Sequence, residues 1–272
     1  MSVGAAAVWR LGAVEARRLV CHPVYPVAML YIAAYVAGAI RSGETGPAAN
    51  GAYVVVMLSL LLVYAPATVV AGNRVAAATF RSRVHEPLDG TPVGVRQHTA
   101  AAIIGVLRGP ALVSLAATGL LQVIGEFTTA HPERPIDVVH HRAALEYLQI
   151  PAVVLGAGLL GVAVARWLPR PGALPLTVLL VWISTVPLYQ PSTTGTPYDR
   201  TWFALWPVWL STDAGLLPRQ PLDQEMWHLA YLLGLGVLAA IAALLRTAGP
   251  RRALCAAAVV AAVATAAADA VT

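Results

Sequence analysis

The stretch from Asn73 to Gln97 reads NRVAAATFRSRVHEPLDGTPVGVRQ and separates two long apolar runs. It is the longest charged passage that the positive-inside rule places in the cytoplasm. Cytoplasmic loops of membrane proteins carry an excess of basic residues, so we expect this stretch to lie in the cytoplasm. Its two prolines and the Asp89-Gly90 turn signal predict that the preceding helix breaks after Arg83 and that another begins near Thr91.

The composition on either side of this stretch is that of a polytopic membrane protein. The chain has 272 residues, 58% hydrophobic and 11% charged, with a mean hydropathy of +0.69. These values are far more apolar than those of a soluble globular domain. All basic charges are arginines, dispersed between apolar runs, which favours membrane orientation over nucleic-acid binding. We predict an all-α protein with a single transmembrane domain over residues 1–272.

The apolar runs have the length of membrane-spanning helices, about 20 residues each. Residues 253–270 are mostly alanine and valine and end near Asp269, so six spans and seven spans both fit the sequence. The predicted spans are 24–41, 51–72, 99–124, 146–167, 173–190, 227–246 and the probable seventh, 253–270.

Arginines fix the orientation of these spans. With the amino terminus inside, twelve arginines fall in inside segments and five in outside segments, while Arg108 falls within the third span. This bias predicts a cytoplasmic amino terminus. The abundance of arginine and alanine is typical of bacterial proteins from GC-rich genomes, so we expect a multi-pass protein of the bacterial inner membrane.

Residues 5–21, AAAVWRLGAVEARRLVC, predict an amphipathic helix. On a helical wheel an apolar face opposes a basic one, so the helix would lie in the membrane interface with its arginines toward anionic head groups. A polar tail with positive-inside charge is the alternative. The predicted apolar face comprises Trp9, Ala13, Ala16, Leu19 and Val20.

These features resemble the permease subunits of ABC transporters of the type-2 exporter class. The resemblance rests on the basic start around Glu15, Arg17 and Arg18, the turn from Glu86 to Pro92, and the spacing of the spans. It implies a cytoplasmic coupling segment, residues 73–97, that docks on a separate ATPase subunit. The chain has no G-x-x-x-x-G-K-[ST] motif, so ATP and Mg would bind the partner and this chain would not itself be an enzyme.

The resemblance also implies a second permease chain, in a homodimer or a heterodimer, and no cofactor on this chain. Ordinary solvated loop charges are the alternative reading of the docking residues. Those residues are Arg81, Arg83, Glu86, Asp89 and Arg96.

Arg108 is the intramembrane candidate, because a charge within a span is costly unless it pairs or reaches the head groups. A functional role and snorkelling to the interface both fit. The few polar or aromatic side chains of the second and fifth spans are candidates for a substrate path. They are Tyr64, Thr68, Trp182, Thr185 and Tyr189.

Two outside segments complete the prediction. Residues 191–226 carry tryptophans at helical spacing, which is typical of an interfacial aromatic belt; by the resemblance the segment is a re-entrant element between the fifth and sixth spans. Residues 131–141 hold three histidines with Glu133 and Asp137, but no H-E-x-x-H motif, so we assign no metal site there.

Other functions fit the sequence less well. Ion-coupled transporters place carboxylates near the membrane midplane, and the first six predicted spans have none in their central parts. An integral membrane enzyme would need a cluster of acids, bases or nucleophiles, for which only the histidine segment offers side chains. That enzyme and an accessory membrane subunit without an ATPase partner remain the alternatives.

Overall fold

A computed structural model describes residues 3–42, 59–81, 94–127, 144–170, 172–189, 222–247 and 249–271, and all their regular secondary structure is helical. The all-α prediction is confirmed for these residues. The helices are α1 (Val3–Val20), α2 (Val24–Ser42), η1 (Leu60–Tyr64), α4 (Ala65–Arg81), α6 (Val95–Val106), η2 (Leu107–Ala111), α7 (Leu112–Phe127), α8 (Ala144–Trp167), α9 (Ala173–Tyr189), α10 (Leu222–Leu245) and α11 (Arg251–Val271).

Five helical segments in the described residues are long and apolar enough to cross a membrane. Two shorter apolar segments, Val24–Ala34 in α2 and Ala173–Trp182 in α9, accompany them. These helices indicate a membrane protein. The five long segments are Leu60–Ala78, Val95–Leu120, Tyr147–Trp167, Glu225–Leu245 and Arg251–Ala270.

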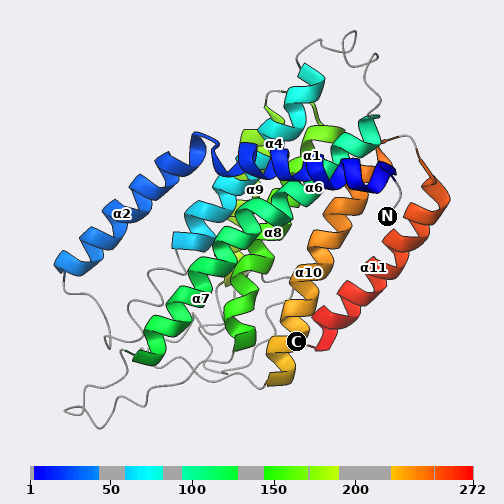
Figure 1. Ribbon diagram of the computed structural model, residues 1–272. Helices are drawn as coiled ribbons and strands as arrows, with labels where there is room; N and C mark the ends of the chain where they lie inside the picture. The colour runs from blue at the N-terminus through cyan, green and yellow to red at the C-terminus, as the bar shows by residue number, and fades with distance from the viewer. Residues whose placement is uncertain are drawn as a thin grey trace.

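The helices form a bundle that α1 crosses at one end, which we call the α1 end (Figure 1). The chain then alternates in direction, and the carboxyl terminus lies at the opposite end. The last turns of α4 and the first turns of α6 project beyond α1 (Figure 1). The predicted coupling segment is therefore helical over its first nine residues, which belong to α4, and from Val95 onward, which belongs to α6.

Glycines set the packing at the centre of the bundle. A Cβ on Gly72 of α4 would lie 2.6 Å from the carbonyl oxygen of Gly158 of α8, and a Cβ on Gly161 would overlap the carbonyl oxygen of Val69. Asn73 adds a hydrogen bond, donating from Nδ2 to the carbonyl oxygen of Gly161 over 3.2 Å. Helix association in lipid relies on such close backbone approach, because lipid supplies no hydrophobic driving force between helices.

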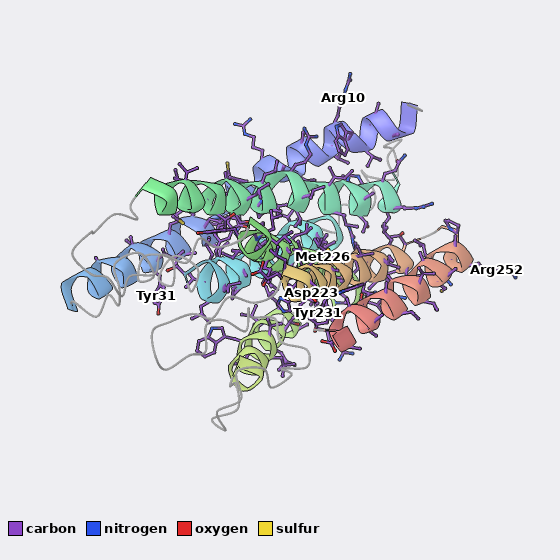
Figure 2. All side chains as sticks on the ribbon, turned by 90° about the horizontal axis from the view of Figure 1, so that it is seen from below. Arg10, Tyr31, Asp223, Met226, Tyr231 and Arg252 are labelled. Atoms are coloured by element: carbon purple, nitrogen blue, oxygen red, sulfur yellow. The ribbon has the colours of Figure 1, made fainter. Side chains whose placement is uncertain are left out.

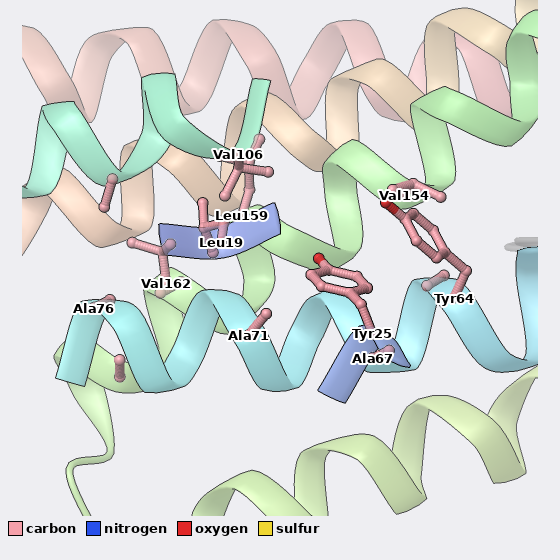
Figure 3. Packing of buried hydrophobic residues seen from close by; sticks show 14 of the residues in the cluster. Leu19, Tyr25, Tyr64, Ala67, Ala71, Ala76, Val106, Val154, Leu159 and Val162 are labelled. Carbon is pink, nitrogen blue, oxygen red and sulfur yellow. The ribbon is translucent and has the colours of Figure 1, made fainter. Parts of the chain in front are cut away.

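A pair of tyrosines connects α2 to η1 and α4. The Tyr25 and Tyr64 rings lie 5.1 Å apart, and the Tyr25 hydroxyl donates to the Thr68 hydroxyl over 3.2 Å. Figure 3 shows Tyr25 over α4 beside Tyr64, within the buried cluster that Leu19, Val106 and Val154 also join. The first predicted span is thus fastened to the second by a polar contact inside an apolar core.

The helix that follows the coupling segment is continuous from Val95 to Phe127 but widens at η2. Pro110 lies inside η2. Proline has no N–H to donate and its ring displaces the preceding turn, which explains a π-helical turn at this point. The predicted third span, 99–124, thus corresponds to one long helix with a local widening.

The predicted seventh span corresponds to α11, which packs along α10. Its contacts include Thr265, whose side chain lies where a Cβ on Gly234 would be, and the buried Ala268. Most of its other side chains are exposed, among them Val259, Val260 and Val263. This exposed apolar surface is that of a helix at the rim of a membrane bundle.

Candidate functional site

The α1 end is built by a close crossing of α1 over α6 and η2. A Cβ on Gly105 would lie 2.9 Å from the Glu15 Cβ, and one on Gly109 would lie 3.0 Å from the carbonyl oxygen of Ala16. Gly12 of α1 approaches Ile104 equally closely, with 2.6 Å between a built Cβ and Cγ2. Gly105 and Gly109 form a G-x-x-x-G pair, the spacing that lets two helix backbones touch in a membrane.

The helix α1 has three faces rather than the two predicted. Ala16 and Leu19 are buried against the bundle, whereas Trp9 and Val20 from the same predicted apolar face are 48% and 41% exposed. Gly12 and Glu15 join the buried face, and the arginines point elsewhere. The prediction of one apolar face toward lipid is therefore wrong for Ala16 and Leu19, because the small residues of this face seat the helix on α6.

Arg108 reaches back to α1. Its Nη1 donates to the carbonyl oxygen of Trp9 over 3.1 Å, and its guanidinium carbon lies 5.0 Å from the centre of the Trp9 ring. A cation over an indole face is an attractive contact. Arg108 therefore lies at the level where α1 crosses the bundle, and its side chain holds α1 there.

A second arginine–tryptophan pair joins the last residue of α8 to the residue that follows α10. The Arg246 guanidinium carbon is 5.6 Å from the centre of the Trp167 ring, and the Trp167 indole donates to the carbonyl oxygen of Ala242 over 2.8 Å. Tryptophan and arginine are both enriched where a membrane helix meets the head groups. Both pairs lie toward the α1 end of the bundle.

Charges are sorted between the two ends. By their positions on the helices, most of the described arginines lie toward the α1 end, while Arg41 lies toward the other. The carboxylates of the described helices occupy the opposite end, in the last turns of α7 and α11 and the first turns of α8 and α10, except for Glu15. The arginines at the α1 end are Arg10, Arg17, Arg18, Arg74, Arg81, Arg96, Arg166, Arg170, Arg246, Arg251 and Arg252.

Glu15, the acidic residue of α1, is only 5% exposed. One carboxylate oxygen pairs with Nη1 of Arg18 at 3.3 Å, and the other has no hydrogen-bond partner among the described residues. A buried carboxylate is costly without partners. On a helical wheel Glu15 falls with the arginines on the polar side of α1. The sequence therefore did not indicate that this glutamate is buried.

The predicted docking residues are described only in part. Arg81 is the last residue of α4, and Arg96 is near the start of α6, with its side chain against Gly249 in the turn between α10 and α11. Arg83, Glu86 and Asp89 lie outside the described residues. Arg96 therefore sits beside the α10–α11 turn, a neighbour that the sequence did not predict.

An apolar cavity of about 240 Å³ lies at mid-height in the bundle, among η1, α4, α8, α9 and α10. All the side chains around it are hydrocarbon or glycine except Trp182, which contributes an indole. Of the predicted substrate-path residues, Trp182 borders this cavity, whereas Tyr64 and Thr68 are buried toward α2. Thr185 and Tyr189 belong to α9, and their side chains lie outside the part of the chain described.

At the end opposite α1, polar side chains are buried at the start of α10. Nδ1 of His228 lies 3.0 Å from Oε1 of Gln149 on α8, and the His228 ring is 6.0 Å from that of Tyr231. Glu225, one turn before His228, is only 3% exposed. Figure 2 looks onto this end of the bundle from below and labels Asp223, Met226 and Tyr231 of α10. The sequence prediction missed this cluster, although Glu225 and His228 are spaced for one helix face.

The structure also bears on the remaining outside segments. α10 begins at Leu222, so the last residues of the predicted segment 191–226 belong to the helix that contains the long apolar segment Glu225–Leu245. Residues 191–221 and the histidine segment 131–141 lie outside the described residues. In the parts described, no group of three or more His, Cys, Asp and Glu side chains is arranged to hold a metal ion.

Comparisons with protein-family models, with curated proteins and with solved structures find no match. The functional argument therefore rests on the geometry of the α1 end and of the cavity.

Proposed function

We propose that this protein is the membrane-spanning permease subunit of an ATP-driven ABC exporter, with a cytoplasmic amino terminus in the bacterial inner membrane. A separate ATPase subunit, which binds ATP and Mg, docks on the segment 73–97, and two permease chains form the complex. The six spans are α2, η1 with α4, α6 with η2 and α7, α8, α9 and α10. α11 is the seventh span, and α1 is the interfacial helix.

The projection of α4 and α6 beyond α1 carries this proposal (Figure 1). Ala101 of α6 packs beneath Gly12 of α1. Val95 lies six residues before Ala101, which is ~9 Å of helix. The segment 82–93 connects the ends of these two projections. With α1 in the membrane interface, the projections present that segment to the cytoplasm, where a soluble partner can bind it.

The faces of α1 support the interfacial position. Trp9 and Val20 are exposed on one side, Arg10 and Arg17 on another, and the glycine-seated face lies on the bundle. A helix in the interface needs an apolar face toward lipid and a basic face toward head groups. The arginines at the α1 end orient that end toward the cytoplasm by the positive-inside rule.

The packing gives the docked segment a route into the bundle. α4 touches α8 through Gly72, Gly158 and Gly161, with backbone against backbone. α6 touches α1 through Gly105. Because packed backbones deform little, a displacement of the α4 and α6 projections would be passed to α8 and α1 rather than absorbed by side chains.

Affinity purification from native membranes in mild detergent tests this proposal. We expect the tagged protein to recover an ATPase with a phosphate-binding loop, and Glu86→Arg with Asp89→Arg to abolish that recovery and transport. Asp223→Arg, an exposed charge reversal at the opposite end, is the matched control and should change neither. Recovery of the protein without any ATPase in several detergents would refute the exporter proposal.

An integral membrane enzyme is the second candidate, because the cluster of Glu225, His228 and Gln149 buries an acid and a base together at one membrane face. Such a pair is one requirement for general acid–base chemistry. Under the exporter proposal, His228→Gln leaves ATPase recovery unchanged. An enzyme would need His228 for turnover in the absence of any ATPase.

A further inference from the structure

The cavity among η1, α4, α8, α9 and α10 extends along the helices. Its lining runs from Leu61 in η1 to Val69 in α4 and from Ala152 to Leu160 in α8, which is ~12 Å of helix. Its volume is about 240 Å³. A hydrocarbon chain can lie along such an apolar path.

The lining excludes charged and strongly polar ligands. Water needs several polar partners to occupy a cavity, and an apolar cavity of ~150 Å³ stays dry and admits small apolar molecules. The cavity here is larger and offers one polar side-chain group, the indole of Trp182. An empty apolar space also deprives its lining of dispersion contacts, which an apolar guest restores.

The cavity borders α4 and α8, the helices between which the proposed transporter would pass on a displacement of the coupling segment. Its α4 wall continues, within the same helix, to the projection that carries the coupling segment, and its α8 wall contacts α4 through glycines. Trp182 lies on α9, a helix with largely exposed neighbours such as Leu179 and Leu180. A displacement of α4 against α8 would therefore change the shape of the cavity.

We propose that this cavity binds the hydrocarbon chain of an amphipathic substrate, so that the exported molecule is lipid-like. That the bound molecule is an exported substrate rests on the proposed function. That a hydrocarbon chain binds here rests on the cavity alone. The chain lies along α4 and α8, with Trp182 forming the wall on the α9 side.

Photolabelling of the protein in liposomes tests the binding. The probe is a fatty acid with a diazirine in its chain, and peptide mass spectrometry locates the adducts. We expect saturable adducts on cavity residues such as Leu62 and Leu235, removed by excess unlabelled fatty acid. Labelling of the cavity that rises linearly with probe and resists competition would refute a binding site, since bulk lipid contact behaves in that way.

Two variants and a matched control sharpen the test. Ala157→Phe occupies the space of the bound chain and should weaken saturable labelling about ten-fold, a loss of ~1.4 kcal/mol in binding free energy. Ala257→Phe, at an exposed position on α11, should not weaken it. Trp182→Ala removes a half-exposed wall without overfilling the core and should abolish saturation. Unchanged saturable labelling in both cavity variants, with normal size-exclusion profiles, would refute the assignment.

A second arm separates a substrate from a resident lipid. In liposomes with the copurified ATPase, ATP with Mg should lower saturable labelling if the chain belongs to exported substrate. Labelling that persists unchanged during ATP turnover would identify a resident lipid and overturn the substrate assignment. If no ATPase copurifies, the proposed function fails while the labelling result still decides whether the cavity binds a chain.

Discussion

Gly105→Ala offers the sharpest test of how α1 is held. The added Cβ would lie 2.9 Å from the Glu15 Cβ and 3.1 Å from the backbone nitrogen of Ala16, and neither atom is at the end of a flexible side chain. Overpacking of this kind costs ~1–3 kcal/mol. Gly119→Ala is a matched control on the same continuous helix, with no atom within 4 Å of its Cβ. Both variants gain the ~0.8–1 kcal/mol by which alanine exceeds glycine in a helix, so their difference isolates the contact with α1.

Two measurements report this difference. Thermal unfolding in detergent should place Gly105→Ala below Gly119→Ala by a free-energy difference of ~1–3 kcal/mol. Hydrogen exchange should show faster exchange of the α1 amides in Gly105→Ala, with the amides of α10 unchanged, because the added methyl lifts α1 and leaves the glycine contacts of α4 and α8 intact. Equal stability of the two variants, or equal protection of α1, would refute the close crossing described above.

Two further predictions concern the same end. Arg108→Ala should destabilise the protein and increase hydrogen exchange of the α1 amides. A double-mutant cycle with Trp9→Leu should give a coupling free energy of ~0.5–1 kcal/mol from the lost cation–π contact. Loss of transport at unchanged stability would instead assign Arg108 to substrate handling. Burial, and then the charge of Arg74, lower the pKa of His22 below 6.5. The unfolded state then binds the proton more readily, so His22 should make stability fall as the pH drops below about 6.5. His22→Gln should flatten that part of the pH profile, and an unchanged slope would exclude His22 as its source.

Hydropathy was enough to locate most of the helices. The predicted spans 24–41, 146–167, 173–190 and 253–270 correspond closely to α2, α8, α9 and α11. Long apolar runs flanked by arginines leave little choice of secondary structure, because the backbone must satisfy its own hydrogen bonds in lipid. The first turn of α10 precedes the predicted span 227–246, because Asp223 and Glu225 make that turn polar; acidic residues are favourable at a helix amino terminus.

Hydropathy could not show which side of a helix faces protein and which faces lipid. In water the apolar face of a helix marks the core, whereas in a membrane both sides are apolar and the periodic signal weakens. The small residues Ala157, Gly161 and Ala165, spaced by four, predict a packing face, and Gly161 does contact α4. Gly105 and Gly109 have the same spacing and contact α1.

The Gly105–Gly109 pair and Arg108 act together to hold α1. A G-x-x-x-G pair brings a helix close but does not by itself fix which helix it receives, and an arginine within an apolar run needs a partner or a head group. Here Gly105 and Gly109 seat α1, and Arg108 between them closes on the backbone and ring of Trp9. The costly charge thus has its partner at the helix that the glycines admit. Under the proposed function α1 lies in the membrane interface, with its exposed apolar side toward lipid and its arginines toward the head groups. In that position the contact with Gly105 and Gly109 would set the height of the bundle in the membrane, and the projections of α4 and α6 would extend beyond the interface.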